Sequence, residues 1–156
     1  MKIRDKYKIE EVENVCFYEN AFFSNTCLGI VERSAVGGRI RFYQNNKKYN
    51  TNDGKDLSIG NYIPNIEELM NDIYVKFDEK LGISVYEENI TQEEYKTFLN
   101  VIFNYKTDFI EKSHYDYKGT SGTDWIFRIN LTNGERIETT GFHEEPIELM
   151  NIRKLF

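Results

Sequence analysis

Residues 125–142 read WIFRINLTNGERIETTGF, and this stretch predicts a β-hairpin. Asn133 and Gly134 separate two runs rich in β-branched and aromatic residues. This residue pair suits a tight turn because both residues tolerate left-handed backbone conformations. In the first run, Phe127 and Ile129 alternate with polar residues, as in a strand with one buried face. The stretch therefore predicts an antiparallel sheet with one side buried.

A helix is expected directly after the hairpin, over residues 146–154. Pro146 can open it, because proline fits the first turn of a helix, where its missing N–H is not needed. Ile147 and Met150 lie three residues apart and are expected to form the apolar face of this helix.

Two segments of the chain have similar sequences. Residues 63–77 (IPNIEELMNDIYVKF) and 144–156 (EEPIELMNIRKLF) share Glu-Leu-Met-Asn after a proline. The elements expected in residues 27–77 and 109–156 also follow the same order. We interpret the chain as one compact α+β domain, an antiparallel sheet with helices packed on one face. Within it, the two segments are either duplicated strand-strand-strand-helix units or a chance likeness.

A helix near residues 91–105 is expected to join these segments, and it has the clearest start signal in the chain. Thr91 and Glu94 form a capping box, in which each side chain satisfies a backbone N–H of the other residue. Apolar residues follow at helical spacing: Tyr95, Phe98, Leu99 and Ile102. A similar stripe predicts another helix over residues 65–77.

Three stretches have weaker patterns. Residues 1–9 alternate between basic and mostly apolar positions, which favours a strand. Residues 10–23 suit a helix or a strand equally. Residues 108–118 are expected to be extended.

Composition limits the classes of function. The chain has 156 residues and a formal net charge of −6, which argues against nucleic-acid binding and against binding to an anionic membrane. It contains no apolar run of membrane-spanning length and no secretory signal, so we expect a cytoplasmic protein. Aromatic residues make up 15%, with eleven tyrosines and eleven phenylalanines. Tyrosine in such number is typical of surfaces that contact partners as well as of a core.

Few residues suggest a reactive or metal-binding centre. Cys16 and Cys27 are interpreted as buried free thiols, with a disulfide between them as the alternative. His114 and His143 each have carboxylates nearby in sequence, but they lack metalloenzyme spacing. We therefore expect no metal, no cofactor and no catalytic role for them. Trp125 is expected to anchor the core.

Carboxylate pairs recur along the chain, and we interpret them as ordinary polar faces. They are Glu10-Glu11, Glu67-Glu68, Glu87-Glu88 and Glu93-Glu94. A general acid needs burial or a charged neighbour to shift its pKa, and the sequence indicates neither.

The leading functional hypothesis is a non-catalytic, acidic protein-binding module that occupies a basic surface on another macromolecule. Immunity proteins, enzyme inhibitors and phage counter-defence proteins have this size and charge. The expected contact residues are Glu144 and Glu145, before the last helix, with Tyr115 and Tyr117 on the neighbouring stretch.

Two alternatives stay open at this point. One is a small enzyme that uses His114 or His143 with nearby carboxylates. The other is a structural subunit that associates with copies of itself through sheet edges or helices.

Overall fold

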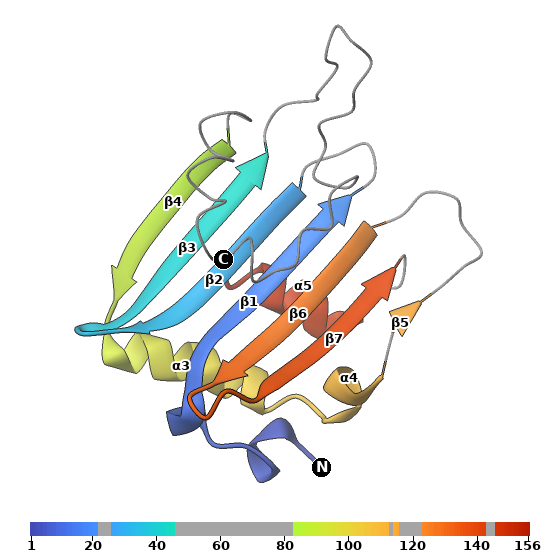
Figure 1. Ribbon diagram of the computed structural model, residues 1–156, viewed down its shortest axis with the longest axis horizontal. Helices are drawn as coiled ribbons and strands as arrows, with labels where there is room; N and C mark the ends of the chain where they lie inside the picture. Colours follow the sequence, from blue (N-terminus) through green and yellow to red (C-terminus); the bar gives the residue numbers. More distant parts are fainter. Residues whose placement is uncertain (22–25, 46–82, 113, 116–122, 143–145) are drawn as a thin grey trace, which may run out of the picture.

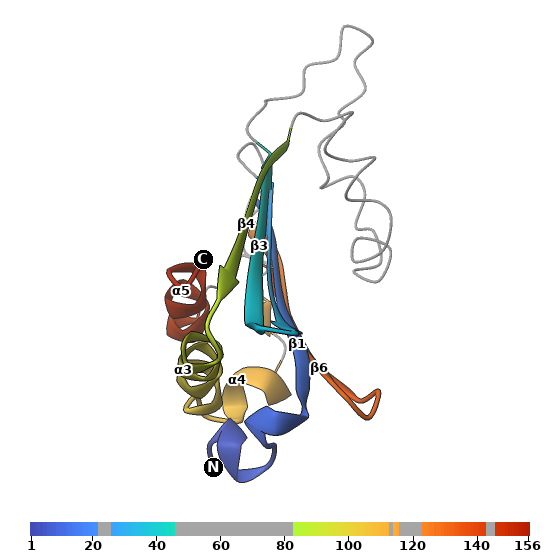
Figure 2. The ribbon, with the colours of Figure 1, turned by 90° about the vertical axis from the view of Figure 1, so that its left-hand side faces the viewer.

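The computed structural model describes the chain outside residues 22–25, 46–82, 113, 116–122 and 143–145. One sheet of seven strands crosses the molecule (Figure 1), and six of its strands run antiparallel to their neighbours. The described helices lie together on one side of this sheet (Figure 2). The α+β architecture expected from the sequence is confirmed.

The order of strands across the sheet is β4-β3-β2-β1-β6-β7-β5. Two consecutive hairpins therefore flank the central strand β1, with β2–β3 on one side and β6–β7 on the other. The short β5 runs parallel to β7. The strands span Val12–Ala21 (β1), Thr26–Ser34 (β2), Gly37–Asn45 (β3), Ile83–Ile90 (β4), His114–Tyr115 (β5), Thr123–Leu131 (β6) and Arg136–Phe142 (β7).

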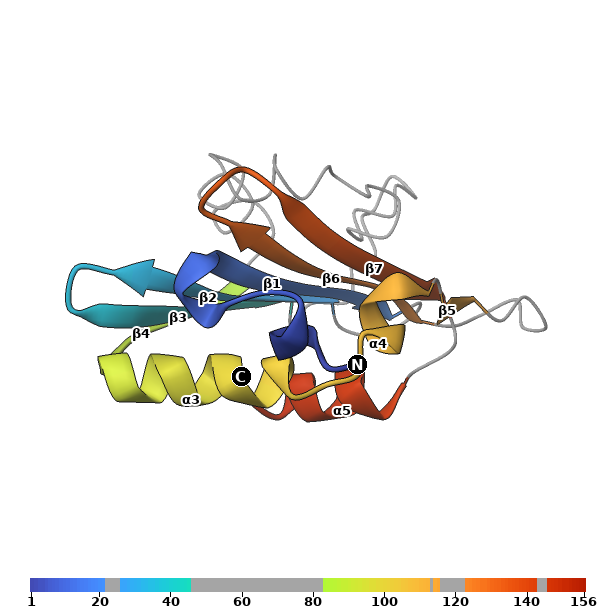
Figure 3. The same ribbon diagram turned by 90° about the horizontal axis from the view of Figure 1, so that it is seen from below.

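The helical layer is seen from below in Figure 3, where α3 and α5 lie side by side under the sheet. Its α-helices are α3 (Gln92–Phe103), α4 (Asp108–Glu111) and α5 (Ile147–Arg153). Two 3₁₀ turns, η1 (Ile3–Asp5) and η2 (Ile9–Glu11), lie near the start of α4 and at the start of β1, respectively, in the same view.

The hydrophobic core fills the space between the sheet and the helices. Phe17 and Phe127 are directly opposite each other on β1 and β6, and both are fully buried. From the helical side, Leu99 and Ile102 of α3 contribute the matching apolar surface. Trp125 is also buried, so its expected role as a core anchor is confirmed.

The strongest local predictions are confirmed. β6 and β7 form the predicted hairpin, and Gly134 has a φ of 88°, the left-handed conformation that the Asn-Gly pair indicated. α3 begins after Thr91, whose hydroxyl accepts from the Glu94 N–H at 3.1 Å while a Glu94 oxygen accepts from the Thr91 N–H at 3.2 Å. The ambiguous stretch 10–23 is resolved mainly as the strand β1.

The predicted strand over residues 1–9 is wrong, because these residues form η1 and a turn that leads to η2. The alternation of apolar residues does not produce a buried strand face here, since only Ile3 of this stretch is fully buried. The Ile3 N–H donates to the Tyr105 carbonyl at 2.9 Å, which docks the segment against the end of α3. The Asp5 carboxylate closes the turn by accepting from the Lys2 N–H at 2.8 Å.

The apolar face predicted for the last helix is also wrong. Leu149 and Ile152 are fully buried, whereas Ile147 is 62% and Met150 41% exposed. A helix of seven residues offers two apolar stripes at a spacing of three, and only its contact with the sheet decides which stripe is covered.

Of the stretch 108–118 expected to be extended, β5 is a strand, whereas Phe109 and Ile110 belong to the short helix α4 and are buried. Residues 113 and 116–118 lie outside the described residues. The predicted helix over residues 65–77 lies outside the described residues. The duplication of 27–77 in 109–156 stays a prediction for the same reason. Among the described helices, none is long and apolar enough to cross a membrane.

Candidate functional site

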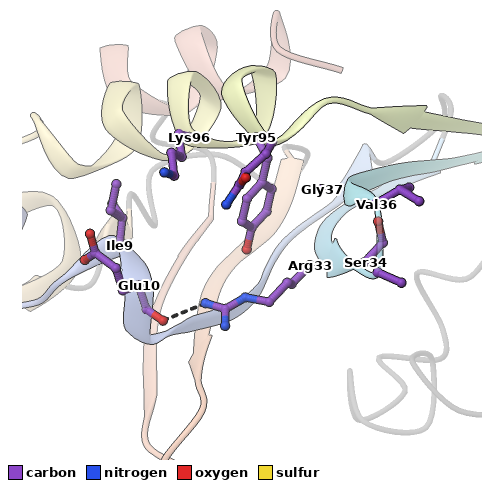
Figure 4. A pocket seen from close by; sticks show the side chains of 10 residues that line it. Ile9, Glu10, Arg33, Ser34, Val36, Gly37, Tyr95 and Lys96 are labelled. Atoms are coloured by element: carbon purple, nitrogen blue, oxygen red, sulfur yellow. Dashed lines mark hydrogen bonds between the residues drawn. The ribbon is translucent and has the colours of Figure 1, made fainter.

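One end of the molecule combines a cleft with a group of exposed acidic residues. The cleft measures about 420 Å³ and opens where η2, the β2–β3 turn and the start of α3 meet (Figure 4). Its lining residues are Ile9, Glu10, Arg33, Ser34, Ala35, Val36, Gly37, Gln92, Tyr95 and Lys96.

Glycine at position 37 allows the β2–β3 turn to approach α3 closely. Gly37 has a φ of 140°, and a Cβ at this position would lie 2.5 Å from the backbone nitrogen of Gln92. A larger residue would therefore push the turn away from the helix and widen the cleft.

The floor of the cleft is held by Arg33. Its Nη2 donates to the carbonyl oxygens of Glu10 at 2.6 Å and of Val12 at 3.1 Å, which ties β2 to the start of β1. Figure 4 shows the Tyr95 hydroxyl pointing down toward this guanidinium. The Tyr95 hydroxyl also donates to the Val12 carbonyl at 3.4 Å. Burial raises the pKa of Tyr95, and the nearby Arg33 partly offsets this rise.

These polar groups therefore hold the fold, and they leave little reactive chemistry in the cleft. Lys96 and Glu10 are exposed at its rim. In the part of the chain that the structure describes, no group of three or more histidines, cysteines and carboxylates could hold a metal ion.

The acidic group lies next to the cleft, on β4 and the first turn of α3. Residues 86–95 read YEENITQEEY, with four glutamates and no basic residue. Glu87, Glu88, Glu93 and Glu94 are all exposed, and Tyr86 of the same strand is 51% exposed. We call these four carboxylates and Tyr86 the acidic end.

Two other carboxylates of the sheet, Glu32 and Glu19, are paired with arginines. Glu32 accepts from Arg39 at 2.6 Å and from Arg41 at 3.0 Å. Arg153 of α5 makes two hydrogen bonds to Glu19 of β1, at 2.8 and 2.7 Å.

No described lysine or arginine makes such a pair with the four glutamates of the acidic end. Glu88 accepts from the Tyr86 hydroxyl, and Glu94 caps α3. Glu87 lies opposite Arg41 in the register, but the Arg41 Nη2 donates to Glu32. The acidic end therefore presents negative charge outward, in contrast to the paired carboxylates of the sheet.

The face of the sheet opposite the helices carries a polar row across its centre. Asn130 donates to Asn14 at 2.6 Å, and the Arg128 Nε donates to Glu138 at 2.6 Å. The Arg128 side chain is only 6% exposed, and its buried Nη1 has no hydrogen-bond partner among the described residues. This row joins β1, β6 and β7 by side-chain contacts, in addition to the backbone ladder.

Cys16 belongs to this row and is a buried free thiol, as predicted. Its S–H donates to the Asn14 side-chain oxygen at 3.4 Å. Cys27 is also a free thiol, but it is half-buried. Burial raises the pKa of each thiol to about 12, so neither is a reactive thiolate at neutral pH.

The contact residues predicted from the sequence are not tested by this structure. Glu144, Glu145 and Tyr117 lie outside the described residues. Tyr115 is placed on β5, opposite Phe142 of β7.

The structure describes only one of the two histidines. His143 lies outside the described residues, whereas His114 is half-buried in the wall of the core. The His114 Nε2 lies 3.0 Å from the Phe109 carbonyl oxygen, and its ring packs on Trp125 with centroids 5.5 Å apart. These contacts give His114 a structural role.

The acidic end was visible in the sequence as two carboxylate pairs, which we interpreted as ordinary polar faces. The signal that this interpretation did not use is the run of ten residues, 86–95, with four acidic residues and no basic residue. That run distinguishes Glu87-Glu88 and Glu93-Glu94 from Glu10-Glu11, which closely follows Lys8, but not from Glu67-Glu68, since no basic residue lies between Lys55 and Lys76.

Comparison with known proteins finds no matching family model, no similar curated protein and no similar solved structure.

Proposed function

We propose that the protein is a non-catalytic binding module whose acidic end occupies a basic surface of another protein. The observation that carries this proposal is the outward-facing charge of Glu87, Glu88, Glu93 and Glu94, which no described lysine or arginine neutralises, beside the exposed ring of Tyr86. Complementary charge accelerates the encounter with a basic partner, and an exposed aromatic ring adds contact area once the partner has docked.

The test compares two variants that change the total charge equally. E87Q/E93Q removes two carboxylates that have no structural contact, and E13Q/E135Q removes two exposed carboxylates elsewhere. Each double substitution removes two negative charges, so the formal net charge of the whole chain changes from −6 to −4.

Affinity capture from the native host, followed by identification of the captured protein, supplies the partner. We expect the wild-type chain and E13Q/E135Q to bind that partner with similar association rates. E87Q/E93Q should associate more slowly, and its defect should shrink as salt rises. Equal association rates for the two variants would contradict the proposal.

The association rate with the captured partner is also measured for variants of Glu144 and Glu145, two of the contact residues predicted from the sequence. Charge reversal at Glu144 and Glu145 should also slow association if the loop before α5 contributes to the same basic contact. An effect confined to these two residues would move the contact surface away from the acidic end.

A further inference from the structure

The outer edge of β4 is the longest unpaired strand edge in the described chain. β4 is the last strand on its side of the sheet and has eight residues, whereas β5 at the opposite side has two. Along this edge, every second residue directs its backbone N–H and C=O away from β3. No hydrogen bond from the described residues reaches these groups.

The side chains of this edge restrict what can pair with it. Tyr86 and Glu88 point to the side of the sheet that carries the helices, and Glu87 points to the other side, because side chains alternate along a strand. An added strand would therefore meet a carboxylate on each face of the sheet, at two consecutive positions.

A second copy of this chain is disfavoured at this edge in the two registers that centre on its carboxylates. Two β4 strands paired across a two-fold axis centred on Glu87 or Glu88 would place identical carboxylates directly opposite each other, and like charges in that position repel. The same charges favour lysine or arginine at the opposing positions.

Resting on the function proposed above, we propose that the basic partner binds as an extended segment that adds a strand to the outer edge of β4. Two consecutive basic residues of that segment lie beside Glu87 and Glu88, one on each face of the sheet. Backbone hydrogen bonds hold the segment, and the two charge pairs fix its register. The exposed ring of Tyr86 packs against the next side chain of the segment on the same face.

The probe is a nine-residue synthetic peptide with a central Arg-Lys flanked by alternating threonine and valine. Two derivatives carry N-methyl groups on alternate amides, one series on each edge of the peptide. All three peptides have the same charge. Strand addition uses only one peptide edge, so one derivative should bind about tenfold more weakly than the parent, while the other binds like the parent.

Amide hydrogen exchange gives a second readout of the binding mode. On addition of the parent peptide, every second amide of β4 should become protected, since the remaining amides already point toward β3. E87Q/E88Q should weaken binding of the parent peptide, and thermal unfolding of this variant should match the wild type.

The possible results separate this inference from the function on which it rests. If both methylated peptides bind like the parent and E87Q/E88Q still weakens binding, the acidic end binds basic ligands but not by strand addition. If the wild type and E87Q/E88Q bind the parent peptide equally, both proposals fail. If the wild type does not bind the peptide, strand addition to β4 fails, and the proposed function is judged by the association rates of E87Q/E93Q and E13Q/E135Q with the native partner.

Discussion

Gly141 of β7 lies directly against the indole of Trp125 on β6. A Cβ built on Gly141 would be 2.3 Å from Cε2 of Trp125, well inside contact distance. Trp125 is only 1% exposed, so its indole lies inside the core. This close approach explains a glycine inside a strand, where glycine is otherwise unfavourable.

The first prediction is that G141A destabilises the protein by about 1–3 kcal/mol, because the added methyl group overpacks the core against a rigid ring. Gly134 provides the control, since a Cβ there meets nothing within 4 Å and only its φ of 88° opposes substitution. Chemical denaturation should rank G141A below G134A in stability. The reverse order would mean that the Trp125 ring moves aside easily.

The second prediction concerns the cap of α3. T91A should lower the free energy of unfolding by about 1 kcal/mol, because the Glu94 N–H loses its acceptor at the helix start. T97A on the same helix is the matched control, since the Thr97 hydroxyl bonds only to the Glu93 carbonyl at 2.9 Å, within the helix. Urea unfolding should show little change for T97A.

The third prediction tests which stripe of α5 faces the core. L149A should destabilise the protein by about 2–5 kcal/mol, because Leu149 is fully buried. M150A should change stability by less than about 0.5 kcal/mol, since Met150 is 41% exposed. Similar losses for both variants in the same denaturation assay would contradict the orientation of α5.

The fourth prediction concerns the pair of Arg128 and Glu138. E138A leaves the buried guanidinium without its carboxylate, whereas R128M replaces the buried charge with an apolar side chain of similar length. We therefore expect E138A to be less stable than R128M. Thermal unfolding of the two variants under the same conditions provides the comparison, and equal stabilities would mean that solvent screens Arg128 effectively.

The fifth prediction follows from the thiols. Burial raises the pKa of Cys16 from 9.0 to about 12, and burial with the nearby Glu19 does the same for Cys27. Between these two pH values the unfolded chain loses thiol protons that the folded chain keeps. The free energy of unfolding should therefore fall as pH rises above about 9, by up to about 1.4 kcal/mol per pH unit for each thiol.

Denaturation of the wild type and of C16A/C27A across this pH range measures the thiol contribution. The curve of the variant should fall less steeply, whatever its stability at neutral pH. Parallel curves would show that the folded thiols titrate at ordinary pH values.

Local signals in the sequence were sufficient for several elements. Asn133 and Gly134 indicated the hairpin because the conformation of a short turn depends mainly on the residues within it, here the segment between Leu131 and Arg136. Thr91 and Glu94 specified the start of α3 for the same reason, since both partners of the cap lie within one helical turn. The α+β class followed from these elements and from their order along the chain.

The acidic end required the tertiary structure. Whether a glutamate is paired depends on which arginine lies across the sheet, and the sequence does not give the strand register. Glu32 is neutralised because β3 brings Arg39 and Arg41 to it, whereas no described arginine or lysine pairs with Glu87, although Arg41 lies opposite it.

The sequence by itself determined the turns, the helix start and the fold class, because these depend on residues close together along the chain. The tertiary structure decided the buried stripe of α5, the 3₁₀ turns near the N-terminus and the free edge of β4. Those features depend on contacts between distant segments, such as the hydrogen bond between Asn14 and Asn130 that joins β1 to β6. Such contacts form only when the whole sheet assembles, so no local pattern records them.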